Sequence, residues 1–145
     1  MFPSRQRRSA TPAEAQRSAL GPEARVRILL VDDSSVMRKI VLRALRQAGF
    51  SGHDFDEADN GRDALAKIES ARPDVVLSDW NMPEMTGMEL LLELKQKGIE
   101  TRFAFITSEA TQPMRLAAIR AGARAFVTKP FTPDTIRTAL SGLLE

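Results

Sequence analysis

The sequence predicts an α/β fold: a five-stranded parallel sheet, doubly wound, with helices on both faces. Strand and helix patterns alternate five times from Arg25 onward. Repeated βα units with short loops form parallel sheets that are covered by helices on both sides. In addition, three of the strand patterns end on charged residues. Open α/β folds place their functional sites at that edge of the sheet.

The first two βα units begin with an apolar strand at 25–32, and Ser34 or Ser35 can cap the helix that follows. That helix ends at Gly49, and its apolar residues recur at helical spacing. These residues are Val36, Ile40, Val41, Ala44, Leu45 and Ala48. A short strand is expected at 55–58. Asn60-Gly61 then indicates a turn before a helix over 62–69, which stops ahead of Pro73.

The remaining units are more strongly marked. Val75–Ser78 is the apolar run of a strand buried on both faces. A Leu-rich helix over 88–96 and a strand over 103–106 follow. Pro113 suits the first turn of a helix that runs to 121, with Gly122 past its end. Ala125–Thr128 is the last strand, and a helix capped by Thr132 buries one face, formed by Ile136, Leu140 and Leu143.

Composition separates residues 1–24 from the remainder. This segment carries a net charge of +2, and residues 25–145 hold 17 basic and 17 acidic groups. Its arginines are Arg5, Arg7, Arg8 and Arg17, set against Glu14 and Glu23. Low hydrophobicity and three prolines predict a basic, mostly disordered N-terminal tail. It serves either as a solvated extension or as a handle for a partner or membrane surface. The folded domain is expected over 25–145.

Several functional classes are excluded or disfavoured. The absence of cysteine rules out disulfides and thiolate chemistry. His53 is the only histidine, and its polar surroundings favour a solvated loop residue over a metal ligand. The neutral body lacks the strong basicity that nucleic-acid binding requires. No apolar run is long enough for membrane insertion, and no signal peptide is evident, so a cytoplasmic location is expected.

The charged strand ends suggest a metal-assisted phosphoryl site. Asp32-Asp33 and Asp79 close two strands, and Lys129 closes a third. Three carboxylates held together need a cation, and a hard, oxygen-ligated ion such as Mg²⁺ fits. The lysine supplies a point charge for an anion such as a phosphoryl group. Each residue has a simpler alternative, since an aspartate can cap a helix and a lysine beside a proline can be solvated. Lys129-Pro130 also permits a cis peptide bond.

Thr107 follows the strand over 103–106. The order Asp32-Asp33, Asp79, Thr107 and Lys129-Pro130 along the chain is typical of one protein family. Residues from about 26 onward resemble the receiver domain of two-component response regulators, which has a flavodoxin-like, CheY-like fold. The segments Asp79-Trp80-Asn81-Met82-Pro83 and Lys129-Pro130-Phe131-Thr132 most resemble the single-domain chemotaxis regulators of that family.

The resemblance implies a role for each matching residue. Asp79 would be the phospho-acceptor, and Mg²⁺ would be held by Asp32, Asp33, Asp79 and the backbone carbonyl of Asn81. Lys129 would neutralise a phosphoryl oxygen. Thr107 and Phe126 would form the conformational switch, although Phe126 lacks the hydroxyl of the tyrosine often found there. Asn81 and Glu109 would tune autodephosphorylation.

The resemblance also implies partners. A histidine kinase would donate the phosphoryl group, a flagellar motor switch protein or another protein target would receive the signal, and a phosphatase could reset it. The protein would then be no enzyme beyond phosphotransfer onto itself and autodephosphorylation. A phosphate sink or phosphorelay intermediate would have the same site. A hydrolase of the haloacid dehalogenase kind is disfavoured, because no second aspartate stands two residues after Asp79 or Asp33. The intact site residues argue against a third alternative, a degenerate receiver domain that acts only by binding partners.

Overall fold

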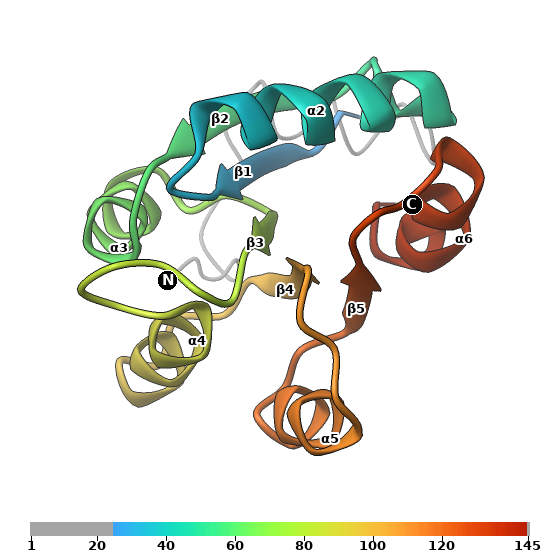
Figure 1. The fold of residues 1–145 in the computed structure, drawn as a ribbon. Helices are drawn as coiled ribbons and strands as arrows, with labels where there is room; N and C mark the ends of the chain where they lie inside the picture. Colours follow the sequence, from blue (N-terminus) through green and yellow to red (C-terminus); the bar gives the residue numbers. More distant parts are fainter. Residues whose placement is uncertain (1–24, 145) are drawn as a thin grey trace.

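The computed structural model describes residues 25–144, so the predicted disorder of the tail at 1–24 lies outside the described residues (Figure 1). The strands are β1 (Arg27–Val31), β2 (Asp54–Ala58), β3 (Val75–Ser78), β4 (Arg102–Thr107) and β5 (Ala125–Thr128). The helices are α2 (Ser35–Leu45), the π-helical turn η2 (Arg46–Phe50), α3 (Gly61–Ala71), α4 (Gly87–Gln96), α5 (Gln112–Arg120) and α6 (Pro133–Leu144).

The strands form one sheet in the order β2-β1-β3-β4-β5, and every pairing is parallel. The strands end nearly in register, since Val31 lies opposite both Ala58 and Ser78, and Thr107 lies opposite Thr128. All five carboxyl ends therefore meet at one edge. The structure confirms the predicted doubly wound five-stranded fold.

Helices cover both faces of the sheet and create two hydrophobic cores (Figure 1). Successive side chains of a strand point to opposite faces, so Ile28 and Leu30 pack with α2 and α6, and Leu29 and Val31 pack with α3 and α4. Val75–Ser78 is buried throughout. This explains the uninterrupted apolar sequence of β3, which has no solvent-facing side.

The helix ends follow the predicted signals with small differences. Ser34 caps α2 by accepting a hydrogen bond from the amide of Met37 at 3.1 Å. Asn60 begins α3 directly as its N-cap, so the expected turn is the first turn of that helix. The helix predicted to run to Gly49 changes at Leu45 into the wider turn η2, where Gly49 has a φ of 102°. Glycine adopts this left-handed conformation without a Cβ clash.

Two of the apolar residues that recur at helical spacing lie outside the buried face of α2. Val36 is 65% exposed and Ile40 is 47% exposed. The residues of this helix segment that are buried are Val41, Ala44, Leu45 and Ala48. At about 100° per residue, Val36 points about 130° and Ile40 about 90° away from the centre of that buried face. The apolar residues at helical spacing therefore span a wider arc of the helix surface than the part that packs on the sheet.

His53 is more engaged than the solvated loop residue that the sequence suggested. Its Nδ1 accepts a hydrogen bond from the amide of Val26 at 3.0 Å, and its ring stacks on Phe50. Burial lowers the pKa of His53, and the nearby Arg25 charge lowers it further. The neutral ring thus fastens the start of β1 to the segment before β2.

Within residues 25–144, no helix combines the length and the apolar character needed to cross a bilayer.

Candidate functional site

The carboxylates of Asp32, Asp33 and Asp79 gather at the carboxyl edge of the sheet. Their oxygen atoms lie within 4.8 Å of one another. Asp32 and Asp33 follow β1, and Asp79 follows the neighbouring β3, where the amide of Asp79 donates to the carbonyl of Val31 at 2.8 Å. The predicted convergence of these strand ends is therefore confirmed, because β1 and β3 are paired neighbours in the sheet.

Lys129 joins this cluster from the end of β5. Its Nζ lies 3.2 Å from Oδ2 of Asp32 and 3.8 Å from Oδ2 of Asp79. The amide of Lys129 donates to the carbonyl of Thr107 at 2.8 Å, and the following Lys129–Pro130 bond is cis, as the sequence allowed. The ammonium group thus stands where it contacts the anionic cluster directly.

The pocket carries more negative than positive charge. The side chains of Asp32, Asp79 and Lys129 are 9%, 13% and 13% exposed. Burial raises the pKa of Asp79, and the carboxylates of Asp32 and Asp33 raise it further, while Lys129 acts in the opposite direction. The single positive charge of Lys129 therefore does not offset the negative charge of the three carboxylates.

This donor set fits a hard divalent cation. Carboxylate oxygens are the ligands that Mg²⁺ prefers, and it needs few of them because it keeps several waters. Asp33 is exposed and keeps the cluster open to solvent. Asn81, whose backbone carbonyl was predicted as a further ligand, lies two residues after Asp79 in the same loop.

Two loops are joined by a hydrogen bond between Asn81 and Glu109. The amide nitrogen Nδ2 of Asn81 donates to Oε1 of Glu109 at 3.0 Å, and both residues are exposed. This contact links the segment after β3 to the segment after β4. The two residues predicted to tune dephosphorylation thus act as a pair in this structure.

Thr107 is fully buried at the end of β4. Its hydroxyl oxygen accepts a hydrogen bond from the amide of Glu109 at 3.2 Å. Phe126, the other predicted switch residue, lies on β5 and packs against an aromatic cluster with Trp80 and Phe105. Thr107 therefore contacts both the loop that leads into α5 and the backbone of Lys129.

Sequence reasoning missed three residues that contact the backbone of Asp32 or Asp79. Arg38 donates from Nη1 to the carbonyl of Asp32 at 2.6 Å and pairs through Nε with Glu57. The hydroxyl of Ser78 donates to the carbonyl of Asp79 at 2.7 Å. Gly87 packs against the same carbonyl. The contact of Ser78 joins adjacent residues, and those of Arg38 and Gly87 join residues six or more positions apart.

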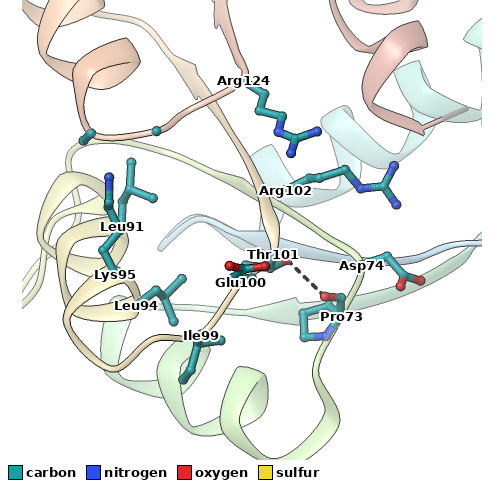
Figure 2. A pocket seen from close by; sticks show the side chains of 12 residues that line it. Pro73, Asp74, Leu91, Leu94, Lys95, Ile99, Glu100, Thr101, Arg102 and Arg124 are labelled. Atoms are coloured by element: carbon teal, nitrogen blue, oxygen red, sulfur yellow. Dashed lines mark hydrogen bonds between the residues drawn. The ribbon is translucent and has the colours of Figure 1, made fainter. Parts of the chain in front are cut away.

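A cavity of about 580 Å³ lies at the opposite, amino edge of the sheet. Figure 2 shows its labelled side chains, which come from α4, from the start of β4 and from the segments that lead into β3, β4 and β5. Its charged groups are of both signs, with Lys95, Arg102 and Arg124 set against Asp74 and Glu100. This cavity is separate from the carboxylate cluster and contains none of the predicted site residues.

The fold and the carboxylate site are those of a receiver domain of the two-component kind. The family model described as the response regulator receiver domain matches residues 28–141. The chain belongs to this family.

Relatives and solved structures agree with this assignment. Chemotaxis protein CheY of Pseudomonas aeruginosa is 35% identical, over 83% of this chain and 97% of that protein. Chemotaxis protein CheY-3 of Vibrio cholerae is 37% identical, over 83% of this chain and 92% of its own length. The structure of Vibrio cholerae CheY4 matches with a TM-score of 0.73 at 35% identity, and covers 83% of this chain and 100% of that one.

A receiver domain from a different kind of regulator has a similar fold. The receiver domain of a putative LuxO repressor protein from Vibrio parahaemolyticus has a TM-score of 0.76 at 28% identity, over 83% of this chain and 90% of that one. Since regulators with different names share this backbone, the fold establishes the receiver domain without specifying its output.

Proposed function

We propose that the protein is a cytoplasmic response regulator that accepts a phosphoryl group on Asp79 and then changes its protein-binding surface. The observation that carries this proposal is the cluster of three carboxylates within 4.8 Å of one another with Lys129 3.8 Å from Asp79. The donor is a phosphohistidine of a histidine kinase, and the output is control of a flagellar motor.

The chemistry is an in-line displacement. A carboxylate oxygen of Asp79 attacks the phosphorus, an O–P bond forms, the N–P bond of the phosphohistidine breaks, and its electron pair returns to the imidazole. Phosphoryl transfer depends mainly on positioning and on neutralising charge. Lys129 holds its ammonium beside the acceptor, and the amide of Trp80 fixes Oδ1 of Asp79 by a hydrogen bond of 2.8 Å.

Asp32, Asp33, Asp79 and the backbone carbonyl of Asn81 would hold Mg²⁺ in this pocket. When bound, the ion supplies positive charge that offsets the charge of the phosphoryl oxygens. In this proposal the chain acts on no separate substrate, so its only reactions are phosphotransfer onto itself and loss of that group. Asn81 and Glu109 set the rate of this loss by controlling access of water.

Thr107 converts the chemical event into a change of surface. Its hydroxyl turns from the amide of Glu109 toward the new phosphoryl group, and Phe126 repacks behind it. A local charge event then biases a two-state element. The helix α5 lies next to Phe126 and exposes the apolar side chains of Leu116 and Ile119, which are 42% and 59% exposed. This is the surface expected to select the target.

Motor control is proposed because the relatives at 35–37% identity are named chemotaxis proteins. A phosphate sink or a phosphorelay intermediate is the second candidate, since it requires the same site. The target it binds distinguishes the two functions.

The acceptor is tested with acetyl phosphate and Mg²⁺, with the mass of the intact protein as the readout. The wild type should gain one phosphoryl group that is lost on hydrolysis, and Asp79→Asn should gain none. Asp134→Asn is the matched control, because it removes an exposed carboxylate of α6 outside the pocket. A phosphoryl adduct that persists in Asp79→Asn would overturn the assignment.

The output is tested by affinity capture from lysate with Mg²⁺ and beryllofluoride, a phosphoryl mimic. Enrichment of a flagellar switch component only with the activated wild type supports motor control. Recovery of only a histidine kinase or phosphotransfer protein, regardless of activation, instead supports the sink or relay.

A further inference from the structure

The ring of Phe126 contacts both an aromatic cluster and a guanidinium group. Its centroid lies 6.2 Å from that of Trp80 and 6.1 Å from that of Phe105. Cζ of Arg115 lies over the same ring, 4.7 Å from its centroid. Nη1 of Arg115 also donates to the carbonyl of Phe126 at 3.5 Å. One side chain therefore contacts both the ring and the backbone of Phe126.

The cation has a particular importance at this position because phenylalanine has no polar end. No hydrogen bond from the ring edge can select between an inward and an outward rotamer. The face of the ring is the part that attracts a cation, and guanidinium groups stack well on aromatic faces. Arg115 and Phe126 are both partly buried, so solvent weakens the interaction only in part.

Arg115 is also connected to the phosphoryl site along the chain. Thr107 accepts a hydrogen bond from the amide of Glu109 at 3.2 Å, and Thr111 caps α5 two residues later. The amide of Arg115 donates to the carbonyl of Thr111 at 3.0 Å, within the first turn of that helix. A shift of Thr107 that pulls on residues 108–111 consequently displaces Arg115 relative to β5.

We propose that Arg115 is a positioning residue that latches Phe126 against Trp80 in the unphosphorylated protein and releases it when Thr107 moves. The proposal rests on the proposed function, because it assigns a regulatory contact to the same switch. Arg115 itself touches neither the acceptor nor the metal-binding carboxylates in the contacts found among residues 25–144.

The latch has a measurable consequence through linkage. A phosphoryl mimic that binds better to the released conformer must first overcome the latch. Its apparent affinity is therefore its intrinsic affinity multiplied by the fraction of protein that is released. Removing a partly buried cation–π contact should raise that fraction, and hence the apparent affinity, by about fivefold.

The experiment is a beryllofluoride titration of the full chain in Mg²⁺, followed by the emission of Trp80, the only tryptophan. Arg115→Gln removes the charge and keeps a good helix former, and its midpoint should fall about fivefold. Arg115→Lys keeps the charge without the planar fork and should lie between this variant and the wild type. Arg120→Gln is the matched control, since it removes an exposed arginine from the end of the same helix.

A second measurement needs neither Mg²⁺ nor a phosphoryl mimic. Cross-relaxation between the ring protons of Trp80 and Phe126 should weaken in Arg115→Gln and should persist in Arg120→Gln. If the wild type fails to respond to beryllofluoride, the proposed function fails, and this ring contact still decides the latch. The latch is refuted if Arg115→Gln keeps the wild-type ring contact, or if its midpoint moves no more than that of Arg120→Gln.

Discussion

Replacing Gly87 by alanine should disturb the acceptor aspartate through direct overlap with its backbone. A Cβ at this position would lie 2.9 Å from Cε1 of Phe105 and 3.1 Å from Oγ of Ser78, and closer still to the carbonyl oxygen of Asp79. Non-bonded Cβ contacts are ordinarily 3.4–4 Å. The helix start and the Asp79 peptide must therefore separate.

The separation has an estimable cost. It breaks the hydrogen bond from the amide of Gly87 to the carbonyl of Trp80, at 2.8 Å, and that from Ser78 to the carbonyl of Asp79, at 2.7 Å. Each is worth about 1 kcal/mol, and the overlap in a packed region adds about 1–3 kcal/mol. The free energy of unfolding should fall by about 3–5 kcal/mol. For a domain of this size, the urea midpoint should fall by about 1.5–2.5 M.

The assay is urea unfolding followed by Trp80 emission, together with phosphorylation of the folded fraction by acetyl phosphate. Gly142→Ala is the matched control, because Gly142 lies within α6 and an added Cβ meets nothing within 4 Å. It should raise the free energy of unfolding by about 0.5–1 kcal/mol through helix propensity. If Gly87→Ala unfolds within about 1 kcal/mol of the wild type, the backbone there yields easily and the reasoning is wrong.

Three other perturbations test different parts of the structure. Burial raises the pKa of Asp79 in the folded protein, so that state binds its proton more tightly than the unfolded chain does. In EDTA the free energy of unfolding should accordingly fall as the pH rises from the ordinary aspartate pKa of 3.8 through the raised pKa of the folded state. Urea unfolding should show no such contribution in Asp79→Asn. Asn81→Ala and Glu109→Ala remove one shared hydrogen bond, so their effects on the dephosphorylation rate should be non-additive by about fivefold; additive rates would count against the pairing. In thermal unfolding, Ile40→Thr should change the free energy of unfolding by less than about 0.5 kcal/mol. Leu45→Ala opens a core cavity and should lower that free energy by about 2–5 kcal/mol. Equal losses in the two variants would contradict the observed orientation of α2.

The sequence by itself determined the fold class and the location of the site. Alternating strand and helix patterns specify a parallel sheet, and parallel strands bring their carboxyl ends to one edge whatever the details of packing. Asp32, Asp33, Asp79 and Lys129 all terminate strands, so their convergence followed from local pattern and topology together. The bounds of β3 and β5 could be predicted for the same reason, since a short apolar run bounded by polar residues leaves little choice.

Only the tertiary structure decided which apolar and polar side chains meet. Val36 and Ile40 have the same chemistry as the core residues of α2, and their exposure depends on how far the sheet extends beneath the helix. The partners of Arg38 and Arg115 lie on other elements, at Asp32, Glu57 and Phe126. Long side chains reach several neighbours, and a one-dimensional pattern records spacing along the chain and not distance across it. The residues of the proposed site could therefore be predicted from the sequence, while the contacts that surround them became visible only in the folded protein.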